Sequence, residues 1–359
     1  MCTTANNREI IEPRIIQLVR ELTAAPATDE VADALKPVME QVVDQAASSQ
    51  GGKRLRALLA LDAFDILAGD VTPDRRDAMI DLACAIEVFQ TAALVHDDII
   101  DESDLRRGRP SAHHALEQAV HSGAIGRGLG LMLGDILATA CIEITRRSAS
   151  RLPNTDALNE AFLTMQREVE IGQVLDLAVE MTPLSNPEAL ANASLNVFRW
   201  KTASYTTIAP LLLALLAAGE SPDQARHCAL AVGRPLGLAF QLADDLLDVV
   251  GSSRNTGKPV GGDIREGKRT VLLADALSAA DTADKADLIA IFEEDCRNDN
   301  QVARTIELFT STGALDRSRE RIAALWGESR KAIAGLELNS EAQRRLTEAC
   351  ARFIPESLR

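Results

Sequence analysis

The feature that most constrains this chain is a pair of aspartate-rich segments, each placed at the end of an apolar helical run. Asp97 and Asp101 follow the run that begins at Ala92, and Asp244 and Asp248 follow a similar run further along. Residues four apart on an α-helix share a face, so each pair projects together, about 6 Å apart. The sequence therefore predicts two helices that each carry carboxylates on one face.

These carboxylates need positively charged partners, because most of their neighbours in the sequence are Leu, Ile, Val and Ala. A carboxylate in apolar surroundings is destabilising unless it is paired or bound to a metal. One copy could be an ordinary solvated helix face, but two copies of the same pattern weaken that interpretation. If the two helices face each other, Mg²⁺ fits between them, since it prefers oxygen ligands and substrate phosphates. The pattern predicts a metal–diphosphate site.

Together with three further motifs, the aspartate segments resemble the trans-prenyltransferases, the polyprenyl diphosphate synthases. The further motifs stand in the family's order along the chain: Gly51-Gly52-Lys53-Arg54-Leu55-Arg56, Arg106-Arg107-Gly108 and Gly257-Lys258-Pro259. The resemblance extends from about residue 30 to about residue 275 and is nearest in pattern to bacterial geranylgeranyl diphosphate synthases. It implies that the chain elongates an allylic diphosphate with isopentenyl diphosphate.

Composition favours an all-α fold in one domain. Hydrophobic residues make up 46% of the chain and aromatic residues only 3%, so Ala and Leu, which favour helices over strands, form most of the core. Length alone would allow two domains. No Pro/Gly/Ser-rich linker divides the chain, so we predict a single domain over residues 1–359 with residues 1–8 disordered. The resemblance implies one large helical bundle around a central cleft, of the isoprenoid synthase type.

Charge and hydropathy exclude other classes of protein. The net charge of −15 argues against a nucleic-acid partner, because phosphate backbones need a basic surface. The six cysteines show no C-x-x-C spacing, which is typical of reduced thiols in a cytoplasmic protein. The longest uninterrupted apolar run, residues 208–218, is too short to span a bilayer. We expect a cytoplasmic protein without a membrane span, with delivery of its product to a membrane left open.

The resemblance assigns one group of residues to isopentenyl diphosphate. Lys53 and Arg56 lie where a helix is predicted to begin, and the backbone N–H groups and helix dipole favour anions there. A solvated, charged helix cap is the alternative interpretation. Gln90, seven residues before Asp97, matches a third family contact, and Arg107 matches a fourth.

A second group is assigned to the allylic diphosphate. By resemblance, Arg106 holds this diphosphate, because forked donors suit phosphate oxygens. Lys201, Thr202 and Gln241 match family positions that reach the same substrate, and residues 198–206 are more polar than a buried helix should be. Two lysines that match the family's phosphate-binding positions follow the second aspartate segment: Lys258 and Lys268.

The mechanism implied by the resemblance uses three Mg²⁺ ions, held by Asp97 and Asp101 on one side and by Asp244 on the other. Charge on the leaving diphosphate is stabilised, an allylic cation forms, and the isopentenyl double bond attacks it. The departed diphosphate takes the released proton, since no side chain is an obvious base. We assign catalytic roles to all six aspartates and to one lysine: Asp97, Asp98, Asp101, Asp244, Asp245, Asp248 and Lys201.

Product length should depend on the residues that precede Asp97 on its helix. Ala92 and Ala93 are small, whereas short-chain members of the family carry a bulky aromatic residue there. Phe89 lies two turns back, about 12 Å from Asp97 at 1.5 Å per residue. It closes the product tunnel if it points inward, or else it packs against a neighbouring helix. We expect mainly geranylgeranyl diphosphate, with a longer polyprenyl chain as the alternative.

Other patterns in the chain carry less chemistry. No Glu stands three residues before any histidine, which removes the signature of di-iron helical bundles. The glycine-rich segment 123–134 lacks the phosphate-loop pattern and predicts close helix packing instead. Gln173 and Asp176 are polar positions on an apolar helix predicted over 162–179, and they resemble family positions near the allylic site.

Two other functions stay open at this stage. A terpene cyclase of the same fold would lack the Gly-Gly-Lys-Arg motif, and a non-catalytic synthase subunit would not need intact aspartate segments. The resemblance favours the synthase, with dimethylallyl, geranyl or farnesyl diphosphate as the allylic partner and a homodimer as the assembly.

Overall fold

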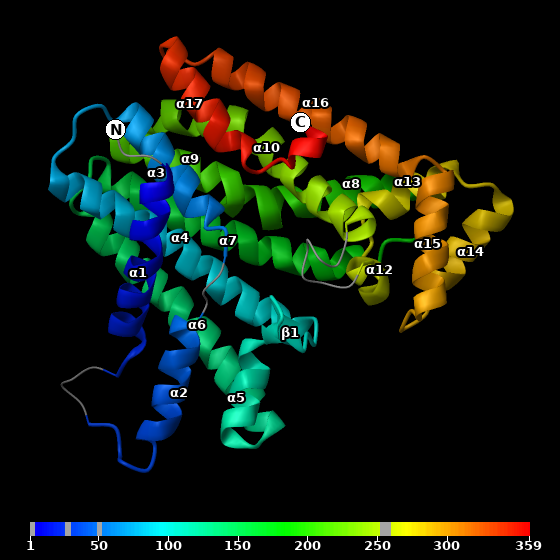
Figure 1. The fold of residues 1–359 in the computed structure, drawn as a ribbon, viewed down its shortest axis with the longest axis horizontal. Coiled ribbons are helices and arrows are strands. Elements are labelled where there is room, and N and C mark those ends of the chain that lie inside the picture. Colours follow the sequence, from blue (N-terminus) through cyan, green and yellow to red (C-terminus); the bar gives the residue numbers. More distant parts are fainter. Residues whose placement is uncertain (1–3, 26–29, 49–51, 252–259) are drawn as a thin grey trace. The chain divides into compact units, whose positions relative to one another are not determined.

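The computed structural model describes residues 4–25, 30–48, 52–251 and 260–359, and it confirms the all-α class (Figure 1). Helices account for nearly all regular structure in these residues, beside one short hairpin. The elements in the first half of the chain are α1 (Thr4–Thr23), α2 (Lys36–Ala47), α3 (Leu55–Leu67), α4 (Pro73–Ile100), β1 (Leu105–Arg106), β2 (Arg109–Pro110), α5 (Ala112–Val120), α6 (Gly123–Ala149) and α7 (Thr155–Val179).

The second half continues with helices of several kinds. Its elements are α8 (Pro187–Val197), the π-helix η1 (Phe198–Ile208), α9 (Ala209–Ala218), α10 (Pro222–Val250), α12 (Gly262–Glu266), α13 (Val271–Ala279), α14 (Thr282–Phe292), α15 (Asp299–Ser311), α16 (Ala314–Ala334), α17 (Ser340–Ala351) and the 3-10 helix η2 (Glu356–Leu358).

The chain packs into two compact units. The first comprises residues 1–164 and 210–225, and the second comprises residues 165–209 and 226–359. The boundaries fall inside α7, α9 and α10, so the chain passes from one unit to the other through helices rather than through a linker. This is why composition along the sequence marks no boundary. A single domain over the whole chain stays a prediction.

The start of α1 differs from the sequence-based expectation. We predicted that residues 1–8 would be disordered, yet α1 begins at Thr4. The buried Asn7 side chain donates a hydrogen bond of 2.8 Å to Asp62 on α3, and it accepts one of 2.9 Å from Arg76 on α4. These bonds attach the segment to the rest of the first unit, which composition alone could not indicate.

Helix α4 is the core of the first unit. Pro73 stands in its first turn and Thr72 caps it by accepting a hydrogen bond from Arg75 N, two strong signals for a helix start. Every residue from Ala78 to Phe89 is buried, so this part is covered on all sides, as expected for a helix at the centre of a core. Helices α1, α3 and α6 pack against it. Its polar C-terminal end is therefore held by a rigid scaffold.

Glycines bring α6 close to its neighbours, as the segment 123–134 predicted. A Cβ atom on Gly130 would lie 2.8 Å from His113 Cβ on α5, and one on Gly134 would lie 2.1 Å from His96 Nε2 on α4. A Cβ atom on Gly126 would lie 2.4 Å from the Cα of Glu117. Such distances leave no room for a methyl group, so the predicted role in helix packing is confirmed.

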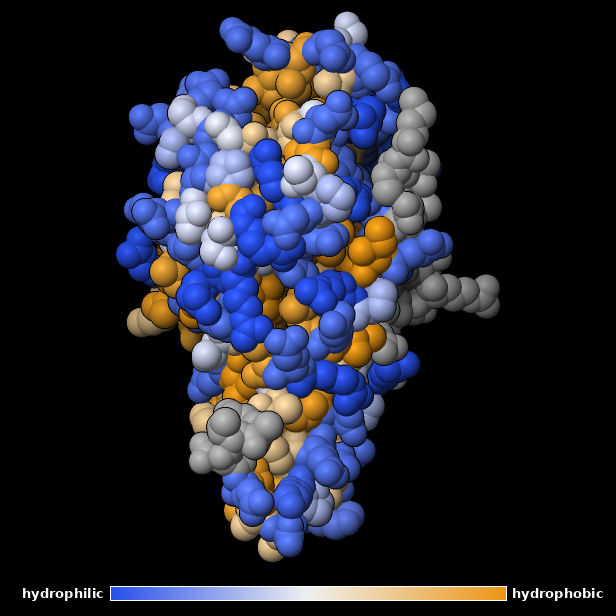
Figure 2. Space-filling view, turned by 90° about the vertical axis from the view of Figure 1, so that its left-hand side faces the viewer, coloured by the Kyte–Doolittle hydropathy of each residue, from blue (hydrophilic) through white to orange (hydrophobic). Residues whose placement is uncertain are grey.

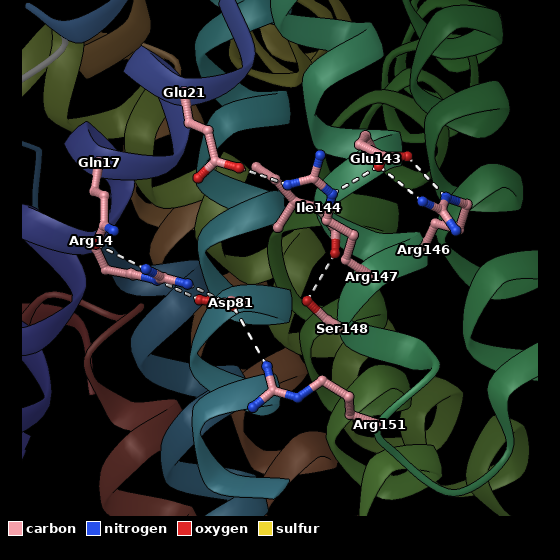
Figure 3. A network of polar contacts seen from close by, with 10 residues as sticks. All are labelled: Arg14, Gln17, Glu21, Asp81, Glu143, Ile144, Arg146, Arg147, Ser148 and Arg151. Carbon is pink, nitrogen blue, oxygen red and sulfur yellow. Dashed lines mark hydrogen bonds and ion pairs between the residues drawn. The ribbon is translucent and has the colours of Figure 1, made fainter. Parts of the chain in front are cut away.

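Ion pairs join the outer surfaces of α1, α4 and α6 (Figure 3). Arg14 of α1 pairs with Asp81 of α4 at 2.6 Å, and Arg147 of α6 pairs with Glu21 of α1 at 2.7 Å. Arg151, just beyond α6, lies 3.9 Å from the same Asp81. Because these pairs are partly exposed, each contributes about 0–1 kcal/mol, and they fix orientation more than they stabilise.

The second unit is organised around α13, on which every residue from Val271 to Leu277 is buried. Helices α8 and α16 pack against it. Arg321 of α16 donates two hydrogen bonds to Asp275 of α13, at 2.8 and 3.3 Å. The segment beyond residue 275, for which the sequence indicated no chemistry, forms α14 to α17 of this unit.

Three helical stretches are long and apolar enough to cross a membrane by length and composition: 73–100, 123–149 and 187–218. Their most apolar windows are 78%, 44% and 67% buried inside the protein. Polar residues interrupt each of these windows, so none of them is an uninterrupted apolar run in the sequence. Figure 2 shows one face of the molecule, on which hydrophilic residues predominate and hydrophobic residues form patches between them. Helix α6 leaves Ile125, Leu131, Met132 and Ile142 exposed.

The packing of α6 predicts opposite effects for two nearby substitutions. Gly126→Ala should lower the free energy of unfolding by roughly 1–3 kcal/mol, because the new methyl group meets the backbone of α5. Gly128→Ala, which meets nothing within 4 Å, should raise it by about 0.5–1 kcal/mol through helix propensity alone. Urea denaturation measures both, and equal effects of the two changes would contradict the close contact.

Candidate functional site

The first aspartate segment lies at the C-terminal end of α4, as predicted. The N–H of Asp101 caps the helix by donating to Asp97 O at 2.8 Å, which places the two carboxylates one turn apart. Asp97 is partly exposed, whereas the side chain of Asp98 is only 4% exposed. The segment therefore presents Asp97 and Asp101 as oxygen ligands and turns Asp98 into the protein.

Asp98 is occupied by Arg106. The guanidinium of Arg106 donates from Nε to Asp98 Oδ1 at 2.8 Å and makes a second short contact through Nη2, while Asp97 lies 3.9 Å away. Burial raises the pKa of Asp98, and the hydrogen bond from Arg106 opposes that rise. Both residues were predicted to act on substrate or catalysis. In this structure Asp98 pairs with Arg106, and the roles of the two residues in catalysis and substrate binding stay predictions.

A β-hairpin presents the two arginines of the Arg-Arg-Gly motif. After Asp101 the chain forms β1 and β2, paired antiparallel with Arg106 opposite Arg109. Arg107 and Gly108 occupy the turn with φ of 54° and 74°. Gly at the second of these positions suits a left-handed backbone. The hairpin therefore points Arg106 and Arg107 in fixed directions.

The hairpin meets the segment that begins α3. A Cβ atom on Gly52 would lie 3.1 Å from Arg107 Nη1, so the Arg107 guanidinium lies directly against this backbone. Desolvation and the positive charges of Arg54 and Arg106 lower the pKa of Arg107. Lys53 is exposed beside it and Arg56 is buried. The structure thus brings two predicted isopentenyl motifs together into one cationic cluster, which favours an anion.

A cavity of about 420 Å³ opens beside α4 in the first unit. It is lined by residues of the hairpin, of α4, α5 and α6, and of the end of α2 with the residue that follows it: Arg106, Arg107, Arg109, Pro110, Thr91, Leu94, Val95, Asp98, Ala112, Leu133, Leu137, Gln45 and Ser48. Only Arg106, Arg107 and Asp98 of these were predicted site residues. A lining that combines arginines with apolar side chains suits an amphipathic anion.

Three residues before the first aspartate segment were assigned to product length. Phe89 and Ala92 are buried, and Ala93 is partly exposed. None of the three lines the described cavity. Gln90 is partly exposed on the same helix.

The second aspartate segment lies near the end of α10 in the second unit. Asp244 is exposed, whereas Asp245 is buried and accepts a hydrogen bond of 2.9 Å from Gln241 Nε2. Burial, and then the negative charge of Asp263, raise the pKa of Asp245 well above its usual range. Asp248 accepts hydrogen bonds from Gly262 N and Asp263 N at 3.2 and 3.0 Å, so it caps the start of α12.

A π-helix carries the polar residues of segment 198–208. Glycines on two neighbouring helices allow it to pack closely: a Cβ atom on Gly172 would lie 2.3 Å from Lys201 N, and one on Gly237 would lie 2.5 Å from Ala203 Cβ. Thr207 donates to Gly233 O at 2.7 Å. π-Helical turns are rare and frequently occur at functional sites, because they redirect the side chains that follow. The sequence indicated the unusual polarity here but not the π-helix.

The predicted allylic residues of the second unit form two linked pairs. Lys201 Nζ donates to Asp176 Oδ2 at 2.5 Å, and Thr202 Oγ1 donates to Gln241 Oε1 at 2.8 Å. Lys268 lies 2.7 Å from Glu266 and 3.6 Å from Asp263. Lys258 falls outside the described residues.

The donor set fits magnesium on chemical grounds. Asp97 and Asp101 supply hard carboxylate oxygens one helical turn apart, the kind of ligand that Mg²⁺ takes beside water and phosphate. Among the residues that the structure describes, no three His, Cys, Asp or Glu side chains are arranged to hold a metal ion. Asp244 belongs to the other unit, so its meeting with Asp97 stays a prediction.

Sequence reasoning missed one acidic residue of the first unit. Glu87 on α4 is buried and accepts hydrogen bonds from Arg54 and from Ala57 N. A lone glutamate inside the apolar run that starts at Ala78 was the available signal. A buried carboxylate needs a positively charged partner. Arg54, to which the resemblance assigns no substrate, was the available cation in the Gly-Gly-Lys-Arg motif.

Comparisons with known proteins agree with these motifs. The model of the polyprenyl synthetase family matches residues 36–309. A short chain isoprenyl diphosphate synthase of Methanothermobacter thermautotrophicus is 33% identical over 267 residues, which cover 74% of this chain and 75% of that protein. The octaprenyl diphosphate synthase of Escherichia coli is 30% identical over 290 residues, which cover 81% of each chain.

A solved structure shares the whole fold. It is the geranylgeranyl pyrophosphate synthase of Corynebacterium glutamicum complexed with isoprenyl diphosphate and magnesium, with a TM-score of 0.82, 31% identity and coverage of 97% of this chain and 98% of that one. The names of the relatives range from short-chain to octaprenyl synthases, so they share a reaction but not a product length. The chain therefore belongs to the polyprenyl synthetase family, and it is a chain-elongating polyprenyl diphosphate synthase of the isoprenoid synthase fold.

Proposed function

We propose that this synthase condenses isopentenyl diphosphate with dimethylallyl, geranyl or farnesyl diphosphate and releases mainly geranylgeranyl diphosphate. The observation that carries the substrate assignment is the cationic cluster in which Arg107 lies against Gly52, beside Lys53 and Arg56. A diphosphate would add negative charge to this cluster of cations, and arginine forks match its oxygens. The solved relative from Corynebacterium glutamicum, which holds isoprenyl diphosphate and magnesium, supports the same ligands here.

We assign the two substrates, isopentenyl diphosphate and the allylic diphosphate, to separate subsites. Lys53, Arg56, Gln90 and Arg107 bind and orient isopentenyl diphosphate. The allylic diphosphate is bound by residues of both units: Arg106, Lys201, Thr202, Gln241, Lys258 and Lys268. Bound Mg²⁺, three ions held by Asp97, Asp101 and Asp244, supplies charge stabilisation on the leaving diphosphate.

Side chains of the second unit would stabilise the allylic cation. The Thr202 hydroxyl and the Gln241 amide form a hydrogen-bonded pair on helices that pack without room for a methyl group. Such preorganised dipoles are effective in a site from which water is excluded. The released diphosphate takes the proton from the condensation product, which regenerates a longer allylic diphosphate.

Product length is proposed from the small residues before Asp97. Ala92 and Ala93 leave room beside the start of the tunnel, and the buried Phe89 would close it further back. A longer polyprenyl product is the second candidate, because the octaprenyl synthase of Escherichia coli is as similar to this chain as shorter-chain relatives are.

We also propose a cytoplasmic homodimer. Helix α6 leaves four large hydrophobic side chains exposed, each at least 40% accessible: Ile125, Leu131, Met132 and Ile142. Large exposed apolar patches on a protein often mark a site of contact with another protein or a membrane. Because the other face of α6 packs in the core, we propose that a second copy of the chain covers this one.

The metal assignment predicts a loss of turnover without a loss of structure. Asp97→Asn and Asp244→Asn should each lower kcat by about three orders of magnitude. The reason is that a bound metal ion stabilises the charge that develops in the transition state by several kcal/mol, and the variant would lose a ligand of that ion. Asp104→Asn is the matched control, since its side chain is 84% exposed beside the hairpin. Steady-state turnover with titrated Mg²⁺ and thermal unfolding measure the effects. Near-normal turnover of the Asp97 variant would contradict the assignment.

The π-helix predicts a second effect on activity. Gly172→Ala should push the backbone of Lys201 and raise KM for the allylic substrate roughly tenfold, since a 2.3 Å contact with backbone cannot be relieved by a side-chain rotation. Gly327→Ala on α16 meets nothing within 4 Å and should leave KM unchanged. If both variants behave like the unmodified enzyme, Lys201 and Thr202 do not bind the allylic substrate in this geometry.

The product-length proposal predicts a longer product from a smaller residue. Phe89→Leu and Phe89→Ala should each lengthen the product, because a smaller side chain at this position leaves the tunnel open further along the helix. The alanine variant should add about one five-carbon unit or more. Phe64→Leu on α3 is the control, because it removes volume from the same core without lying on the helix of Asp97. Chromatography of the dephosphorylated products decides the matter. An unchanged length in both Phe89 variants would place the end of the tunnel on another helix.

A further inference from the structure

Glu87 is a buried carboxylate that binds the start of α3 through both oxygens. One oxygen binds a residue in the first turn, and the other binds the residue just before the helix. Its side chain is 2% exposed. Oε1 accepts a hydrogen bond from Ala57 N at 3.1 Å, and Oε2 accepts one from Arg54 Nη1 at 3.4 Å. Burying a carboxylate is unfavourable unless it is paired and hydrogen-bonded. Glu87 therefore joins α4 to the start of α3.

The segment that it holds has an unusual backbone. Arg54 precedes α3 with a φ of 50°, a left-handed conformation that is rare for residues other than glycine. Ala57 belongs to the first turn of α3, where N–H groups have no partner within the helix and a negative charge is favourable. Such a conformation persists when surrounding contacts hold it. Glu87 provides these contacts, because it binds both Arg54 and Ala57.

Arg54 is itself fully engaged with protein groups. Its guanidinium, 3% exposed, also donates from Nε and Nη2 to the carboxylate of Glu12 at 2.8 and 3.1 Å. It is therefore a structural residue of the Gly-Gly-Lys-Arg motif rather than a ligand for substrate. The other two cations of the motif, Lys53 and Arg56, are the residues that we assign to the anion together with Arg107.

We infer that Glu87 is a positioning residue for the isopentenyl diphosphate subsite, which it serves by fixing the start of α3 and the turn before it, where Arg56 and Lys53 lie. This inference rests on the proposed function. Gly52, whose backbone Arg107 contacts, belongs to the same turn. A shift of this turn therefore moves the cations of both isopentenyl motifs relative to one another. The allylic residues Lys201 and Thr202 belong to the other unit, and Arg106, the allylic residue of this unit, is paired with Asp98 rather than with this segment.

A simpler role for Glu87 would be to balance charge beneath the cationic cluster. The two roles predict opposite signs. Glu87→Gln removes one negative charge, so it would lower KM for isopentenyl diphosphate if charge were the whole effect. If Glu87 positions the turn, the same change raises that KM, because the neutral amide binds the Arg54 guanidinium poorly.

The experiment compares KM for both substrates in four variants of the full-length protein. Glu87→Gln and Glu87→Asp should raise KM for isopentenyl diphosphate roughly tenfold, with less than about a threefold change in KM for farnesyl diphosphate. Glu87→Asp keeps the charge but is one methylene too short to reach both partners. Glu12→Gln removes a carboxylate from the same arginine while leaving Ala57 bound, and it should change that KM less than the Glu87 variants do.

Lys53→Ala is the reference variant for a residue proposed to contact isopentenyl diphosphate directly. It distinguishes an error in the proposed subsite from an error in the positioning role of Glu87. If it fails to raise KM for isopentenyl diphosphate selectively, the proposed subsite is wrong. If it does so while both Glu87 variants keep normal values, the subsite stands and the positioning role is overturned. A lower KM in Glu87→Gln, or equal changes for both substrates, also overturns it. Should the Glu87 variants not fold, Arg54→Lys, which cannot bridge Glu12 and Glu87, carries the same expectation and the same refutation.

Discussion

Charge pairing inside apolar surroundings is the constraint on which the first unit depends. Helix α4 is buried on all sides from Ala78 to Phe89, and it carries three buried acids that each need a cation: Asp81, Glu87 and Asp98. Arg14 reaches Asp81 from α1, Arg54 reaches Glu87 from the turn before α3, and Arg106 reaches Asp98 from the hairpin. Each pair ties a separate segment to one rigid helix. Asp97 and Asp101, at the C-terminal end of α4, are carried by the same rigid helix.

The second unit reaches a comparable result by close backbone packing. Glycines on α7 and α10 remove the side chains that would separate those helices from the π-helix, and Thr207 adds a hydrogen bond to Gly233 O. The π-helix then aligns Lys201 with Asp176 and Thr202 with Gln241. A polar group in such a packed place has few alternative positions, which is the condition for stabilising a short-lived cation.

The same residue types act differently in the two aspartate segments, although their spelling is similar. Asp98 binds an arginine, whereas Asp245 accepts from a glutamine through Oδ1 and has no hydrogen-bond partner for Oδ2 among the described residues. Asp101 lies at the end of α4, and Asp248 caps α12. A shared motif therefore specifies which groups are present and their spacing, while their partners decide what each carboxylate does.

The sequence by itself determined the helical class, the places of α4 and α10, and the family, because helical periodicity and motif order are local properties of the chain. It also indicated the packing glycines of α6. Only the tertiary structure decided that Asp98 holds Arg106, that Glu87 fixes the turn at Arg54, and that segment 198–208 is a π-helix. These features join residues far apart in sequence or arise from close contacts between helices. They depend on which surfaces meet, and no local pattern encodes that.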